Sequence, residues 1–168
     1  MSVRAPAARR LVCGNDDRCD DGAAIHAVRQ LAAVLRDGQR EVDVNRCGQL
    51  DIDDLLQAPP GMALLIVDAA IGVPAGSIVT RTFDQLVSDA TGPAPHSSHA
   101  LPIAQVVGVA RQLSDQPVDG LFIGIGGSDF GFGTELSAPV NEAMPAFVAA
   151  IDAAISRLIA DQAVTARA

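Results

Sequence analysis

The chain has 168 residues, of which 49% are hydrophobic, and its net charge at pH 7 is −8. This length fits one filled core, so we expect a single domain over residues 1–168, with flexible ends at residues 1–9 and about 162–168. All basic residues are arginines and they form no run, which excludes the basic surface of a nucleic-acid binder. The longest apolar stretches, such as Met62 to Val67, are much shorter than the roughly 20 residues that span a bilayer, so we expect a cytoplasmic protein with no membrane partner.

The first half of the chain alternates strand and helix patterns. Alternation of this kind is typical of α/β proteins, in which helices cover a sheet. The expected elements, in order, are a buried strand at residues 10–13, a helix from Gly22 to a stop at Gly38, a half-buried strand at 41–45, a short acidic helix at 50–57 and a fully buried strand at 62–68.

The second half continues the alternation. The expected elements are a strand at residues 77–82 toward a sheet edge, a surface loop at 84–96, a helix from Ser98 with Pro102 in its first turn, a buried strand at 119–125 and a final helix capped by Ser137. The pattern therefore predicts a three-layer α/β sandwich. Its twisted, mostly parallel sheet has about five strands, with helices on both faces.

The three cysteines, Cys13, Cys19 and Cys47, are odd in number and have no C-x-x-C spacing. This argues against a disulfide framework and against a thiolate zinc site. We expect reduced thiols, mostly buried.

Chemistry-bearing residues follow the predicted strands. An acidic loop with Asp16, Asp17, Asp20 and Asp21 comes after the first strand, Asp68 ends the "LLIV" strand, and His99 lies in the "HSSH" segment. The carboxyl ends of parallel strands meet at one edge of the sheet, where sites form. Carboxylates with an imidazole suit a divalent cation such as nickel, zinc or manganese. The sequence therefore indicates a cation site at this edge.

Each of these residues also has a simpler interpretation. Asp20 and Asp21 precede a helix, where acids satisfy free N–H groups and complement the helix dipole. The alternative interpretation of Asp68 is a turn-forming residue at the end of a strand, and that of His99 is an ordinary surface or loop histidine. Asp16 and Asp17 are interpreted as solvated loop charges. At a helix start, His99 would keep a lone pair free for a metal.

Four ordered blocks resemble the hydrogenase maturation endopeptidases. The opening "GNDDRCDDG" is similar to that family's G-N motif with paired acids, and "LLIVDAAIGVPAGSI" to its strand with a following P-G turn. "SSHALPIAQVVGVARQL" resembles its S-S-H helix start, and the stretch from "FIGIGGSDFGFG" to "FVAAI" its closing loop and helix. The resemblance covers about Leu11 to Ile159.

The resemblance implies an endopeptidase that removes a C-terminal extension from the large-subunit precursor of a [NiFe] hydrogenase after nickel insertion. It implies that Asp21, Asp68 and His99 are the catalytic, metal-contacting residues, and that the nickel is carried by the substrate. Other divalent cations would fit the site in vitro. Gly14 and Asn15 are expected to donate hydrogen bonds to the substrate near the cleaved bond.

Two departures from the family pattern lie near this site. Asp17 stands where the family has an apolar residue, and this added acid could tune metal affinity or substrate choice. Cys19 stands where the family has a small residue, and its thiol could offer a competing soft ligand. The alternative function is a non-catalytic module that binds or checks nickel during hydrogenase assembly. Peptidyl-tRNA hydrolysis on a similar fold needs a basic surface, which a net charge of −8 does not provide.

Overall fold

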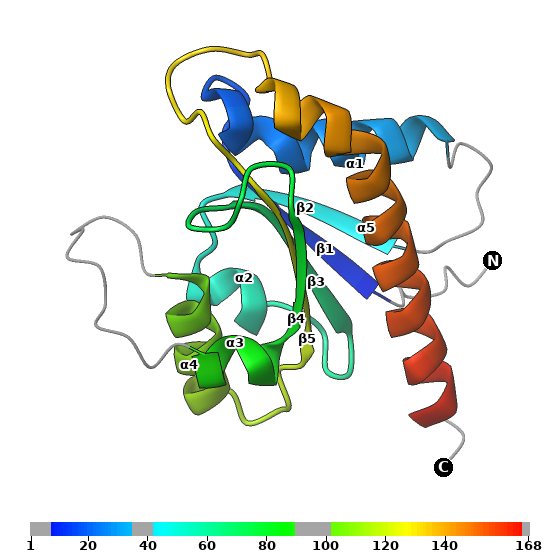
Figure 1. Cartoon of the computed structure of the whole chain (residues 1–168). Coiled ribbons are helices and arrows are strands. Elements are labelled where there is room, and N and C mark those ends of the chain that lie inside the picture. Colours follow the sequence, from blue (N-terminus) through cyan, green and yellow to red (C-terminus); the bar gives the residue numbers. More distant parts are fainter. Residues whose placement is uncertain (1–7, 35–41, 90–101, 166–168) are drawn as a thin grey trace.

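The computed structural model describes residues 8–34, 42–89 and 102–165, which form a five-stranded sheet with helices on both faces (Figure 1). Strand order is β2-β1-β3-β5-β4, and β4 runs antiparallel to β5 while the other pairs are parallel. The strands are β1 (Ala8–Cys13), β2 (Val42–Gly48), β3 (Ala63–Ala70), β4 (Ile78–Thr82) and β5 (Gly120–Gly126). The predicted three-layer α/β sandwich is confirmed.

The central strand β3 shows why both faces of the sheet are covered. Leu65 and Val67 are buried in the core beneath α1 (Ala23–Val34) and α5 (Ala138–Thr165). Leu64 and Ile66 point to the opposite face and are buried in a second core, which the remaining helices cover. Successive strand residues point to opposite faces, so a strand buried on both sides is apolar throughout. The remaining helices are α2 (Ile52–Leu56), α3 (Phe83–Asp89) and α4 (Ile103–Leu113).

The two ends of the described chain belong to regular elements. Ala8 is the first residue of β1 and is fully buried, whereas a flexible end was expected up to residue 9. Helix α5 continues to Thr165, beyond the expected limit at about residue 162.

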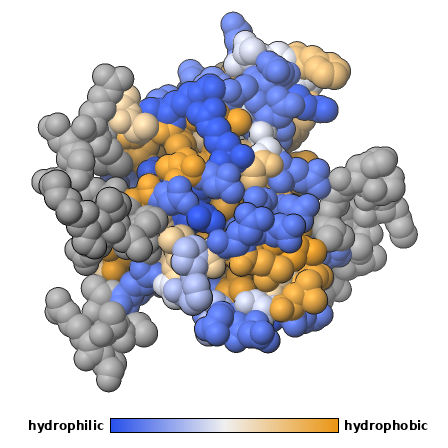
Figure 2. All heavy atoms as spheres, turned by 180° about the vertical axis from the view of Figure 1, so that it is seen from behind, coloured by the Kyte–Doolittle hydropathy of each residue, from blue (hydrophilic) through white to orange (hydrophobic). Residues whose placement is uncertain are grey.

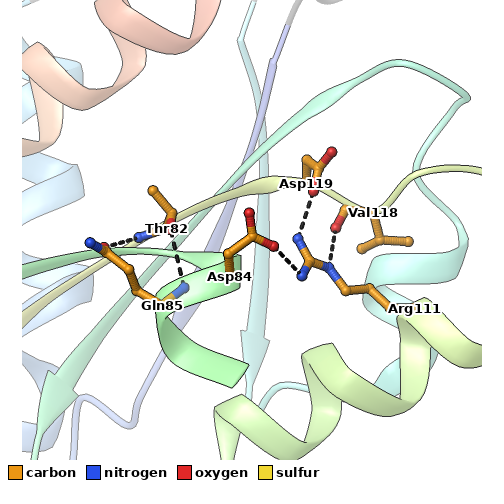
Figure 3. A network of polar contacts seen from close by, with 6 residues as sticks. All are labelled: Thr82, Asp84, Gln85, Arg111, Val118 and Asp119. Atoms are coloured by element: carbon orange, nitrogen blue, oxygen red, sulfur yellow. Dashed lines mark hydrogen bonds and ion pairs between the residues drawn. The ribbon is translucent and has the colours of Figure 1, made fainter. Parts of the chain in front are cut away.

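Residues 84–89 form a helix instead of the predicted surface loop. Thr82 and Gln85 exchange hydrogen bonds: the Gln85 N–H donates to Thr82 Oγ1 at 3.2 Å, and the Thr82 N–H donates to Gln85 Oε1 at 2.9 Å (Figure 3). This reciprocal pair is a capping box, which satisfies free donors at a helix start. The T-x-x-Q spacing was the signal for α3, and the loop prediction missed it. Residues 90–96 of the predicted loop lie outside the described residues.

The helix expected from Ser98 begins later. Pro102 is the N-cap residue of α4 and has extended backbone angles, so the first helical residue is Ile103. Pro102 therefore precedes the helix rather than lying in its first turn. Because α4 begins at Ile103, its dipole is no longer a reason to expect a free lone pair on His99.

Helix α5 is long and apolar enough over Ala138–Gln162 to cross a membrane by length and composition alone. The sequence analysis had not recognised such a segment. In the structure one side of α5 is buried against α1 and the sheet through Val140, Met144, Phe147 and Ile151. Core packing therefore accounts for the large apolar side chains on this side of α5. On the face seen from behind, hydrophobic areas are separated by hydrophilic ones (Figure 2).

Candidate active site at the carboxyl edge of the sheet

The chain turns sharply where β1 ends. Gly14 has φ +107°, and its N–H donates to Gly48 O, at the end of β2, at 2.6 Å. A Cβ atom on Gly14 would lie 1.9 Å from Asp21 O and 3.9 Å from Asp68 Oδ1. Only glycine fits both this backbone conformation and this space. Gly14 is therefore the point at which the segments carrying Asp21 and Asp68 come together.

Asp68 lies within β3 rather than at its end, because the strand continues to Ala70. Its side chain is half-buried, and Oδ1 accepts a hydrogen bond from the Ala69 N–H at 2.8 Å. Burial, together with a smaller effect of the negative charge of Asp21, raises the pKa of Asp68 to about 7 against the effect of that hydrogen bond. A cation between the two carboxylates would relieve this repulsion.

Asp20 is fully buried, which the sequence analysis did not foresee. Its carboxylate accepts hydrogen bonds from the backbone N–H groups of Ser128 at 2.8 Å, Asp129 at 2.9 Å and Ser137 at 2.7 Å. The Ser137 hydroxyl donates a further one at 2.7 Å. Burial by itself would raise the pKa of Asp20, but these hydrogen bonds outweigh it and hold the pKa below its ordinary value.

Asp20 therefore ties the start of the chain to the segment that leads into α5. It does not cap the short 3₁₀ helix η1 (Cys19–Gly22) in which it lies, since the cap position of η1 has no side-chain hydrogen bond. Ser137 directly precedes α5, as predicted for its cap, but its hydroxyl donates to Asp20. The capping interpretation of Asp20 was wrong.

The other two acids of the loop differ from each other. Asp16 is half-buried and forms an ion pair with Arg29, so it is not the solvated charge that was expected. Asp17 is exposed, as expected. Cys19 is buried, and burial together with the charge of Asp129 raises the pKa of its thiol. A raised pKa makes a thiol a poor nucleophile.

An open pocket of about 440 Å³ lies beside Asp21. Its lining includes Gly14, Asn15 and Gly48. The Gly14 N–H is already used by Gly48 O, so Gly14 contributes space rather than the expected hydrogen-bond donor. Asn15 stays exposed at the pocket, and its Oδ1 accepts the Asp17 N–H at 2.9 Å.

The third predicted ligand, His99, lies outside the described residues. Within residues 8–34, 42–89 and 102–165, no three His, Cys, Asp or Glu side chains are grouped so that they could hold a metal ion. The described part of the site is therefore a pair of carboxylates, and carboxylates are suitable ligands for a divalent cation that also has other ligands.

Cys13 and Cys47 lie next to this site and are free thiols, with their Sγ atoms 3.3 Å apart. The mutual hydrogen bond and burial raise the pKa of the Cys13 thiol far above its ordinary value, and the charge of Asp68 adds to the effect. Cys19, the third cysteine, is also a free thiol in the structure.

A second, larger hollow of about 750 Å³ lies at the opposite edge of the sheet, where Ala63 and Gly120 begin their strands. Arg111 beside it is held by three groups: Asp84 Oδ1 at 2.7 Å, Asp119 Oδ1 at 2.6 Å and Val118 O at 2.8 Å (Figure 3). Arg111 thus fastens α3 and α4 to the start of β5. Its donors are engaged within the fold, so we assign it a structural role.

The fold and this site define a class: a mostly parallel α/β protein with paired carboxylates at the carboxyl edge of its sheet. Residues 25–154 match the family HycI, described as hydrogenase maturation protease. The chain belongs to this hydrogenase maturation protease family, as its sequence blocks indicated. A search of curated proteins found no match.

Solved structures share the fold. The hydrogenase maturating endopeptidase HybD from Escherichia coli is 18% identical, with 89% of this chain and 91% of that chain covered and a TM-score of 0.69. HybD from Thermococcus kodakarensis is 21% identical, with 86% and 96% covered and a TM-score of 0.63. HycI from the same organism is 21% identical, with 87% and 90% covered and a TM-score of 0.62.

Proposed function

We propose that this chain removes a C-terminal extension from the large-subunit precursor of a [NiFe] hydrogenase once the precursor carries nickel. The observation that supports this most is the meeting of Asp21 and Asp68 around Gly14, in a chain that belongs to the maturation protease family. Two half-buried carboxylates that repel each other are suited to receive a cation brought by a partner.

In this proposal Asp21, Asp68 and His99 contact the nickel held by the substrate. Asp68 retains its proton to about pH 7, so its carboxyl releases that proton when the cation arrives. The nickel would add binding energy only for a loaded precursor, which explains how an unloaded one is left uncut. The positive charge near the scissile bond would also stabilise the oxyanion that develops on its carbonyl.

The reaction takes place in the cytoplasm in this proposal. Its support is the cysteine content: three cysteines, an odd number without C-x-x-C spacing, do not form the disulfide framework that is typical of small secreted proteins.

Intact-mass measurement of a precursor tests this function. A nickel-loaded precursor and a nickel-free precursor are incubated with the wild-type chain, and we expect loss of a C-terminal peptide only from the loaded one. Asp21→Ala, Asp68→Ala and His99→Ala should each abolish the loss, whereas Asp17→Ala, which changes an exposed acid of the same loop, should preserve it.

Two results would contradict the proposal in different ways. Binding of the loaded precursor without any cut would favour the alternative function, a module that binds or checks nickel. Processing at the wild-type rate by all three site variants would show that the carboxylates and His99 are not the working residues.

A further inference from the structure

Residues 127–137, the loop between β5 and α5, are fixed to the segment that carries Asp21. The Cys19 N–H donates to Gly133 O at 2.7 Å, the Asp20 N–H to Asp129 O at 2.9 Å, and the Gly133 N–H to Asp17 O at 2.9 Å. The Asp20 carboxylate adds five hydrogen bonds, which it accepts from Ser128, Asp129 and Ser137. A loop anchored at so many points pays little ordering entropy when a partner binds.

This anchored loop presents an aromatic side chain to solvent. Phe132 is 91% exposed, yet the Arg18 guanidinium carbon lies 5.4 Å from the centre of its ring. Arg18 is itself held, since its Nη2 donates to Phe130 O at 3.0 Å. A cation at this distance attracts the face of an aromatic ring, so Phe132 is held in place although nothing covers it.

A second exposed apolar side chain lies at the same edge. Ile71 is 83% exposed and directly follows β3, whose last carbonyl, Ala70 O, accepts the Gly127 N–H at 3.2 Å. Of the large hydrophobic side chains in the described residues, Phe132 and Ile71 are the two most exposed. Both occupy loops at the carboxyl edge, where Asp21 and Asp68 lie. Aromatic residues are enriched in protein–protein interfaces, so the exposed Phe132 ring is the stronger candidate contact of the two.

We propose that Phe132 is a docking contact for the substrate protein and that Ile71, at the same edge of the sheet, contributes to this contact. Asp20 anchors the loop that carries Phe132. The inference rests on the proposed function, because the occupant is the hydrogenase precursor, whose C-terminal extension must reach Asp21 and Asp68. An apolar side chain of the precursor packs on the Phe132 ring. Such a rigid aromatic contributes more binding energy than a mobile side chain of equal area.

The test compares Phe132→Ala with Leu113→Ala. Leu113 is also exposed, at 64%, but it ends α4, which leads back to the start of β5 at the opposite edge. Both variants remove an exposed apolar side chain, so both should keep the wild-type melting temperature. Binding of nickel-loaded precursor is measured by biolayer interferometry, and processing is measured as kcat and KM.

We expect Phe132→Ala to weaken binding and raise KM about tenfold with kcat unchanged, because truncating an interface aromatic at a binding centre costs more than about 1 kcal/mol. Leu113→Ala should match the wild type, and Phe132→Tyr, which keeps the ring, should come within about twofold of it. Equal binding by Phe132→Ala and wild type, or equal losses in both alanine variants, would overturn the proposal. If the wild-type chain binds the precursor but leaves it uncut, the proposed function fails. The ratio of the affinities of the wild type and Phe132→Ala for the precursor still decides the role of Phe132.

Discussion

Replacing Asp20 with alanine would remove the acceptor that holds residues 127–137 against η1. Three backbone N–H groups and the Ser137 hydroxyl would lose their partner at once. Each buried donor left without an acceptor costs about 1–3 kcal/mol. Ser128 and Asp129 are exposed enough for water to replace some of the lost bonds, so we expect a total loss of about 3–5 kcal/mol in the free energy of unfolding.

Calorimetry or urea unfolding measures this loss. For a chain of this size 1 kcal/mol lowers the melting temperature by about 2–4 °C, so Asp20→Ala should melt roughly 10 °C below the wild type. Asp17→Ala is the matched control, because Asp17 is exposed and its hydrogen bond with Gly133 uses its backbone carbonyl, which alanine keeps. It should melt within about 2 °C of the wild type.

The pH dependence supplies a second readout of the same variant. The folded state holds the pKa of Asp20 below its ordinary value, so its contribution is complete above about pH 4 and is lost as the pH falls through the lowered pKa. The difference in stability between wild type and Asp20→Ala should therefore shrink in acid. A melting temperature of Asp20→Ala within 2 °C of the wild type at pH 7 would refute the role of Asp20 as an anchor.

Three further predictions concern the site and the core. Asp68→Asn should become more stable relative to the wild type as the pH rises from about 4 to about 7, by roughly 2 kcal/mol after allowance for partial exposure. The reason is that the folded state raises the pKa of Asp68 to about 7 and so disfavours its ionised form. Chemical unfolding across this pH range measures the stability difference, and a difference that stays constant would contradict the prediction. Gly14→Ala should lose processing together with about 2 kcal/mol or more of stability, since its Cβ would lie 1.9 Å from Asp21 O; a normal melting curve with full activity would refute the close approach. Leu65→Ala, in the centre of β3 and fully buried, should cost about 2–5 kcal/mol through the cavity it leaves, and an unchanged melting temperature would count against that burial.

Local sequence patterns predicted much of the fold. The apolar run that forms β3 identified the central strand, since a strand covered on both faces needs apolar residues at every position. Helix α3 was missed although Thr82 and Gln85 carried its capping signal. Gly92, Pro93 and Pro95, which follow it, favoured the prediction of a loop over residues 84–96.

The division of roles between neighbouring acids could not be predicted in the same way. Asp20 and Asp21 are adjacent and chemically equal, and both precede α1. What separates them is burial beneath residues more than a hundred positions away, and no local pattern reports such a contact. The meeting of Asp21 and Asp68 at one edge was predictable, because parallel strands bring their carboxyl ends to one edge whatever the loops contain.

The anchor between Asp20 and Ser137 joins residues 117 positions apart, which affects how the enzyme matures on the ribosome. A nascent chain of which only the first hundred residues have emerged already contains Asp21 and Asp68. It still lacks Ser128, Asp129 and Ser137, whose hydrogen bonds to Asp20 hold η1 in place. The carboxylates would gain their final arrangement only after β5 and the residues leading into α5 have emerged. Contacts of such long range also slow folding, because the intervening chain must be ordered first. Proteolytic activity would thus begin only when the chain has emerged at least as far as Ser137.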